Sequence, residues 1–141
     1  MADIDALYKR AEEAFQKRSY DYARDLFLQI LVLDPDHANA RKALKGTLIR
    51  KFQESGATSK IRLIAMKGQF EIQLKTTKDA LKKIDLCQNY LKDDPTNSKV
   101  RGVLAEALYS LGHNNAAAAE AEMSFADDTS NLAAALLCPS E

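Results

Sequence analysis

The sequence predicts an all-α protein of about seven helices that pack as antiparallel pairs. Three observations support this prediction. Apolar side chains recur every three or four residues along most of the 141-residue chain, which is the spacing of a stripe on a helix. These stripes end at prolines, glycines and serines, which are residues typical of helix boundaries. Hydrophobic residues make up 46% of the chain, enough for a core, and the length indicates a single domain.

The first two predicted helices form a hairpin. Apolar residues from Ile4 to Phe15 fall on one helical face. Ser19 is expected to cap a second helix that begins at Tyr20, with its hydroxyl accepting a backbone N–H. That helix ends before Pro35, which has no N–H to donate and whose ring clashes with the preceding turn. Because the turn between them is short, the two helices must pack antiparallel.

The middle of the chain is less regular. A third helix is expected over residues 38–54 and stops at Ser55 and Gly56, where glycine supplies the left-handed turn that closes many helices. Residues 57–76 fit either a helix or a strand, because the run from Phe70 to Leu74 alternates strictly between apolar and polar residues. We favour a helix, since a lone hairpin of strands is only marginally stable in water.

The last part of the chain repeats the helical pattern. The residues Asp94 and Pro95 end the first of these helices, and a turn from Gly112 to Asn115 separates the other two. A short apolar piece over residues 132–137 is expected to cover the last face of the core. The three helices are predicted over residues 78–92, 97–111 and 116–126.

An internal repeat organises these helices. In the first hairpin, small alanines allow two helix backbones to approach closely, larger side chains fill the space between the helices, and a proline ends the second helix. The positions concerned are Leu7, Ala11, Ala14, Tyr20, Ala23, Phe27 and Pro35. Residues 4–37 thereby resemble a tetratricopeptide repeat, a 34-residue helix-turn-helix unit. This resemblance implies an α-solenoid of stacked antiparallel helix pairs.

Further copies of the repeat are weaker. One covers residues 97–131 but lacks a large aromatic residue at Ala121 and a closing proline at Thr129. A degenerate copy covers residues 68–96, with a new repeat starting near Gly68.

The number of helices exposes an irregularity. Repeats consist of pairs, yet three candidate helices lie between Pro35 and Pro95. We therefore expect residues 38–67 to hold a helix that caps the first repeat, followed by an irregular segment, and residues 132–141 to form a C-terminal cap.

The even charge balance hides a strong local asymmetry. Residues 1–40 carry five basic and eight acidic side chains, residues 41–85 twelve and four, and residues 86–141 three and eight. The basic middle segment can solvate helices and pair with the acidic ends, or it can form a site for an anion. As the sharper hypothesis, we name an anion patch at Arg41, Lys42, Lys45, Arg50 and Lys51.

The sequence offers no support for catalysis. His37 and His113 are isolated turn residues, and no zinc-binding, phosphate-loop or hydrolase motif occurs, so we expect no enzyme, metal or cofactor. Cys87 and Cys138 lack zinc or redox spacing, which suits a reducing cytoplasm. No apolar run is long enough to span a membrane, and the first residues lack a secretory signal.

The resemblance implies a protein-binding scaffold whose first helices line a concave groove. The expected partner is a protein, a peptide or a second copy of the chain, and no small-molecule substrate is evident. Nucleic acid is disfavoured, because no aromatic residues alternate with the basic ones in segment 41–85. The groove residues implied by the repeat are Tyr8, Lys9, Glu12, Gln16, Lys99, Val103, Glu106 and Ser110.

Overall fold

The computed structural model describes residues 3–55 and 60–128, and within these ranges the chain forms seven α-helices and no strand. The all-α prediction is therefore confirmed for the described part of the chain. The apolar piece at 132–137 and the proposed C-terminal cap lie outside the described residues. The helices are α1 Ile4–Gln16, α2 Tyr20–Leu33, α3 Ala38–Ser55, α4 Lys60–Thr76, α5 Ala80–Leu91, α6 Ser98–Ser110 and α7 Asn114–Asp127.

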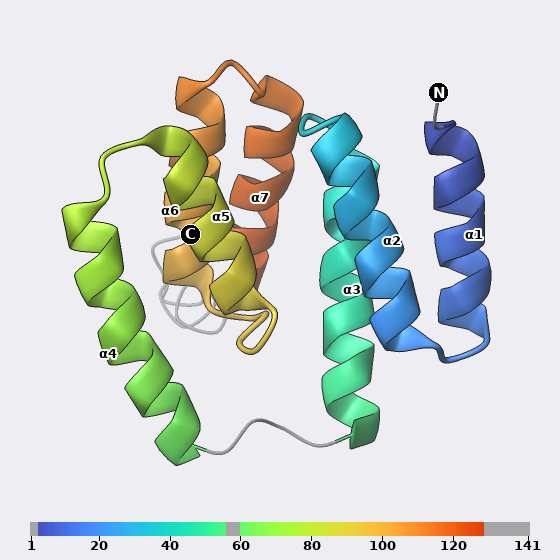
Figure 1. Ribbon diagram of the computed structural model, residues 1–141, viewed down its shortest axis with the longest axis horizontal. Helices are drawn as coiled ribbons and strands as arrows, with labels where there is room; N and C mark the ends of the chain where they lie inside the picture. Colours follow the sequence, from blue (N-terminus) through green and yellow to red (C-terminus); the bar gives the residue numbers. More distant parts are fainter. Residues whose placement is uncertain (1–2, 56–59, 129–141) are drawn as a thin grey trace, which may run out of the picture.

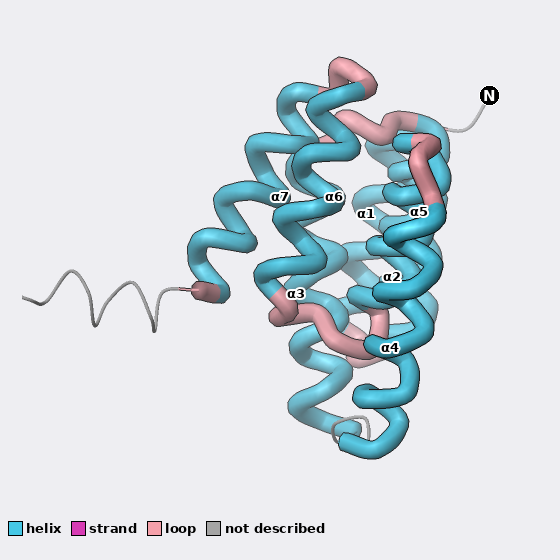
Figure 2. The backbone as a smooth tube through the Cα atoms, turned by 90° about the vertical axis from the view of Figure 1, so that its left-hand side faces the viewer, coloured by secondary structure: helices cyan, strands magenta, loops and turns pink. Residues whose placement is uncertain are grey.

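The helices pack in two groups that meet mainly through one pair of helices. In the first group α1 packs on α2 and α2 on α3, while in the second group α4, α5, α6 and α7 pack in succession. The groups join where α3 packs against α7, although these helices are far apart in the sequence. The result is a row of helices with α1 at one end and α4 at the other (Figure 1). A view from the side shows that the helix axes are roughly aligned with one another (Figure 2).

Each group has its own hydrophobic core. In the first group Ala11 and Ala23 are fully buried, Phe27 is 1% exposed, and all three belong to one cluster with Leu7 and Ile30. The packing roles predicted for these residues are thus confirmed. The second core is built around Cys87, Leu104 and Leu108, with Phe70 supplied by α4. These separate cores explain why the chain needs additional contacts to hold its two groups together.

Residues 60–76 form a helix, so the strand alternative is wrong for this part of the ambiguous segment. The alternation from Phe70 to Leu74 arises because α4 has apolar side chains on opposite faces: Phe70 is buried, whereas Ile72 is exposed. A new repeat is predicted to start near Gly68, but Gly68 lies inside α4, so no helix begins at this position. Residues 57–59 lie outside the described residues.

The cap predicted for the second helix is wrong. Ser19 occupies the N-cap position of α2, but its side chain makes no capping hydrogen bond. At the starts of two other helices, His37 Nδ1 accepts the backbone N–H of Ala40 in α3, and Asn97 Oδ1 accepts that of Val100 in α6.

Asp36 caps a helix of the other group. One of its carboxylate oxygens accepts the backbone N–H of Ala116 at 2.8 Å, and the other accepts the Asn115 side-chain N–H at 2.9 Å. The N-cap residue of α7, His113, makes no side-chain capping bond of its own. The turn between α2 and α3 therefore supplies the capping carboxylate for α7, which ties the two groups together at one end.

Candidate functional site

An open groove lies between α1 and α3. It has a volume of about 270 Å³ and combines aromatic, small and polar side chains. Its residues come from α1, α2 and α3, so the packing of the first group shapes it. The lining residues are Tyr8, Glu12, Phe15, Gln16, Phe27, Ala43, Gly46 and Thr47.

Aromatic contacts fix the wall formed by α1. The ring of Tyr8 meets Phe27 edge to face at a centroid distance of 5.5 Å and stacks on His37 at 5.6 Å. Partial burial raises the pKa of the Tyr8 hydroxyl above its usual value, and the nearby Glu12 carboxylate raises it further. The hydroxyl is therefore a neutral hydrogen-bond donor at physiological pH.

The opposite wall, formed by α3, has an opening at Gly46, which has no side chain. A Cβ atom placed on Gly46 would meet nothing within 4 Å, so the space above it is open to a ligand. At the other end of the groove the guanidinium of Arg50 lies 5.6 Å from the centre of the Phe15 ring. This contact holds the ring of Phe15 against α3.

The structure brings three of the predicted groove residues together. Tyr8, Glu12 and Gln16 line the groove, whereas Lys9 is exposed on α1 and is not part of the lining. The α3 residues of the groove were missed, because the sequence does not reveal which face of α3 turns toward α1. The four predicted residues on α6 belong to the other group of helices and do not reach this groove: Lys99, Val103, Glu106 and Ser110.

The five cations named as an anion patch spread over several faces of α3. Each of them lies within ion-pair distance of a carboxylate in the same chain. Arg41 pairs with Glu120, Lys42 with Glu122, Lys45 with Asp127, Arg50 with Glu54 and Lys51 with Asp21. Three of these pairs cross from α3 to α7, so they join the two groups of helices.

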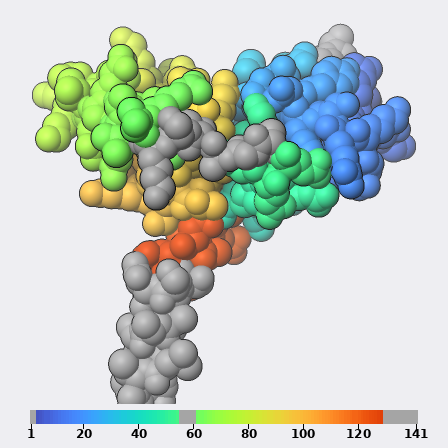
Figure 3. Space-filling model, turned by 90° about the horizontal axis from the view of Figure 1, so that it is seen from below, coloured from blue at the N-terminus to red at the C-terminus, as the bar shows by residue number. Residues whose placement is uncertain are grey.

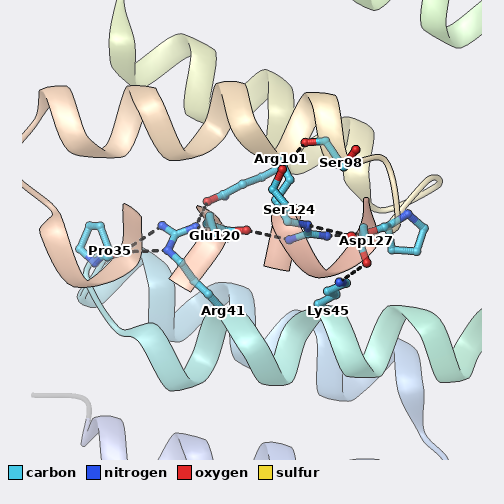
Figure 4. A network of polar contacts seen from close by, with 10 residues as sticks. Pro35, Arg41, Lys45, Ser98, Arg101, Glu120, Ser124 and Asp127 are labelled. Atoms are coloured by element: carbon cyan, nitrogen blue, oxygen red, sulfur yellow. Dashed lines mark hydrogen bonds and ion pairs between the residues drawn. The ribbon is translucent and has the colours of Figure 1, made fainter. Parts of the chain in front are cut away.

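A buried ionic network forms the centre of this junction (Figure 4). Glu120 is 3% exposed and lies between two arginines, with Arg41 at 3.2 Å and Arg101 at 2.7 Å. Arg41 also donates to the backbone oxygen of Pro35 and to Gln88 Oε1 at 2.9 Å. Burial lowers the pKa of Arg41, but the Glu120 carboxylate opposes this shift, and a guanidinium remains charged at any physiological pH.

The network continues at Asp127. One carboxylate oxygen binds Lys45, while the other lies 3.8 Å from Arg101 Nε, too far for a hydrogen bond. Both atoms of the longer pair are buried without a hydrogen-bond partner. The junction of the two groups therefore contains buried charges whose hydrogen bonds are only partly satisfied.

The sequence contains a signal for this network that the repeat pattern did not use. The segment Asp-Pro followed by five residues and Arg occurs twice, from Asp34 to Arg41 and from Asp94 to Arg101. In both copies the arginine folds back onto the oxygen of its own proline. The two turns are thus equivalent, and both deliver a guanidinium to Glu120.

Residues 3–55 and 60–128 contain no group of three potential metal ligands, and no helix in these ranges is long and apolar enough to cross a membrane. Cys87 is a free, buried thiol, and burial raises its pKa to about 12, which makes it a poor nucleophile. No protein-family model matches the chain, and no curated protein is significantly similar to it.

Proposed function

We propose that the chain is a non-enzymatic scaffold of tetratricopeptide type that binds a protein segment in the groove between α1 and α3. The resemblance of residues 4–37 to the repeat supports this function, as does the packing of Ala11, Ala23 and Phe27 in the hairpin core. The buried thiol of Cys87 fits the proposed cytoplasmic location.

The groove itself is the observation on which the proposal depends. Phe15 and Phe27 supply apolar surface, while Tyr8, Glu12 and Gln16 supply hydrogen-bonding groups. A peptide could insert one apolar side chain above Gly46 and bond its backbone to these polar groups. Because the aromatic walls are already held in place, binding would require little reordering of the protein.

Filling the groove tests the proposal. Peptides selected from a random library on the wild-type protein would be titrated against wild type and a Gly46→Leu variant. We expect the dissociation constant to rise at least about tenfold, because leucine occupies the open space beside Tyr8 and Phe15. The fold should survive, since no atom lies within 4 Å of the added Cβ.

A matched control separates the groove from the rest of the surface. Tyr109 is an exposed aromatic residue on α6, so Tyr109→Ala should leave the affinity of groove-binding peptides unchanged. Peptides whose affinity is the same for wild type and Gly46→Leu, with both proteins folded, would exclude the groove as the binding site.

A further inference from the structure

The helix α4 forms one end of the row of helices. Its principal neighbour is α5, which it contacts through Phe70 and through the partly buried Met66 and Leu74. In the space-filling view α4 and α1 lie at opposite ends of the described molecule (Figure 3). The face of α4 that turns away from α5 is therefore an end surface of the row.

That outer face is apolar. Ile61, Ile64 and Ile72 are 83%, 72% and 66% exposed, a concentration of large aliphatic side chains on a single helix. Ala65 and Gly68 lie between them, and a Cβ on Gly68 would meet nothing within 4 Å. At 100° per residue, these five positions share one side of the helix. The outer face is thus an apolar ridge with a notch at its middle.

The opposite end of the row has a different character. The outward side of α1 carries Asp5, Lys9 and Glu13, and none of the large exposed apolar residues in the described part of the chain lies on α1. A polar outer helix is what a stack of helices needs at an end that faces water. The α1 end therefore presents a polar surface to water, whereas the α4 end leaves apolar surface uncovered.

Basic residues border the apolar ridge. Lys67, Lys75 and Arg62 are exposed on α4, and Glu71 is the only acidic residue of that helix. Neither Lys67 nor Lys75 forms an ion pair within residues 3–55 and 60–128. Two copies of α4 packed face to face would bring these like charges together, which disfavours a symmetric dimer through this surface.

We propose that the outer face of α4 binds an acidic amphipathic helix of a partner protein. A large apolar side chain of the partner would occupy the notch at Ala65 and Gly68, where small residues let two helix backbones approach closely. The isoleucines would cover its apolar face, and its carboxylates would lie beside Lys67 and Lys75. This surface is distinct from the groove between α1 and α3.

A helix fits this face better than a membrane or a nucleic acid. The notch removes apolar depth at the centre of the ridge, where insertion into lipid would require large side chains. Stacking of nucleic acid bases requires aromatic side chains, and the outer face of α4 has none.

The test uses two labelled model peptides of equal length. Both have leucines along one helical face, and this face is flanked by glutamates in one peptide and by lysines in the other. Fluorescence anisotropy would measure the binding of each peptide to the full chain. We expect the glutamate peptide to bind at least about tenfold more tightly, and this preference to weaken with added salt.

Charge reversal provides the decisive variant. A Lys67→Glu, Lys75→Glu double variant should bind the lysine peptide more tightly than the glutamate peptide. The matched control is Lys9→Glu, Lys17→Glu, on α1 and at its C-cap, which makes the same charge change at the other end of the row and should keep the wild-type preference. Gly68→Leu should weaken the binding of the glutamate peptide to the wild-type surface and of the lysine peptide to the charge-reversed surface, because leucine fills the notch. A Cβ atom at this position would meet nothing within 4 Å inside the protein.

Several results would overturn the proposal. Equal binding of both peptides, or an unchanged preference in the double variant, would exclude recognition by charge. A solution mass showing a dimer that Ile64→Glu dissociates would mean that a second copy covers this face. Binding of anionic vesicles or duplex DNA, but not of the glutamate peptide, would mean that the partner is not a protein helix. The groove variant Gly46→Leu should leave glutamate-peptide binding intact, so failure of one proposal is distinguishable from failure of the other.

Discussion

At the scale of single residues, the most consequential side chain is Glu120. It is the shared partner of two buried arginines that reach it from equivalent turns. Buried ion pairs contribute little net stability compared with apolar packing, but removal of one partner leaves an uncompensated charge in the interior. The network is therefore better understood as fixing how the two groups fit together than as a source of stability.

Replacing Glu120 with alanine should strongly destabilise the protein. Arg41 and Arg101 would lose their common carboxylate while remaining buried, so we expect the free energy of unfolding to fall by about 3–5 kcal/mol. Urea denaturation followed by circular dichroism measures this change. The exposed Glu106→Ala on α6 is the control and should stay within about 0.5 kcal/mol of wild type. Equal losses for both variants would contradict the role assigned to Glu120.

At the scale of the helical elements, packing positions and groove positions share the same hairpin. Phe27 is buried between helices, and its ring also forms part of the groove floor, whereas Glu12 is exposed at the rim. A helix can thus supply binding residues on its outer face while its inner face holds the core.

The difference between packing positions and groove positions predicts different effects of substitutions on the free energy of unfolding. Phe27→Ala should lower the free energy of unfolding by about 3–5 kcal/mol through an interhelical cavity. Ala23→Glu should cost several kcal/mol by burying a charge at a fully enclosed site. Glu12→Ala should leave the melting temperature almost unmoved and change only the affinity for groove ligands. A similar drop in melting temperature for all three variants would contradict this division.

Two glycines should respond oppositely to alanine. Gly68 lies inside α4 with open space around it, so Gly68→Ala should stabilise the protein by about 0.5–1 kcal/mol. Gly112 has φ +84° in the turn before α7, a conformation in which alanine is strained. Gly112→Ala should therefore destabilise by about 1 kcal/mol or more. Chemical denaturation of both variants would show whether the signs differ.

At the scale of the whole molecule, the fit between the two groups of helices depends on the junction between α3 and α7. Its contacts are the Glu120 network, the pair of Lys45 with Asp127, and the capping of α7 by Asp36. These contacts are polar, and those that join the first group of helices to α7 connect residues about eighty positions apart in the sequence. Acid that protonates these carboxylates should therefore first weaken the contacts between the two groups of helices.

Asp36 provides a test of this dependence on pH. The backbone N–H of Ala116, followed by the side-chain N–H of Asn115, lowers the pKa of Asp36 below its ordinary value of 3.8. Because the folded state holds this carboxylate ionised, its contribution to stability is complete above that value and is lost as pH falls through the lower, folded pKa. The stability difference between wild type and Asp36→Ala should accordingly be present at pH 7 and shrink in acid below about pH 3.8. A difference independent of pH would contradict capping by the ionised carboxylate.

The helices and their stops could be read from the sequence because they depend on local chemistry. The spacing of Leu7, Ala11 and Ala14 marks the buried face of α1, and Pro35 ends α2 by its covalent structure. The resemblance to the repeat, and not local chemistry, implied Tyr8, Glu12 and Gln16 as groove residues, and all three line the groove between α1 and α3. The run from Phe70 to Leu74 kept a strand open as the alternative to the favoured helix, because a helix with two apolar faces resembles alternation over five residues.

The sequence by itself therefore determined the helical composition and the first hairpin. Only the tertiary structure decided that α3 packs against α7, that Asp36 caps a distant helix and that the outer face of α4 is exposed. The physical reason is the range of the interactions. Helical periodicity and proline stops act within a few residues, whereas the partners of Glu120 and Asp36 are brought together only when the two cores dock.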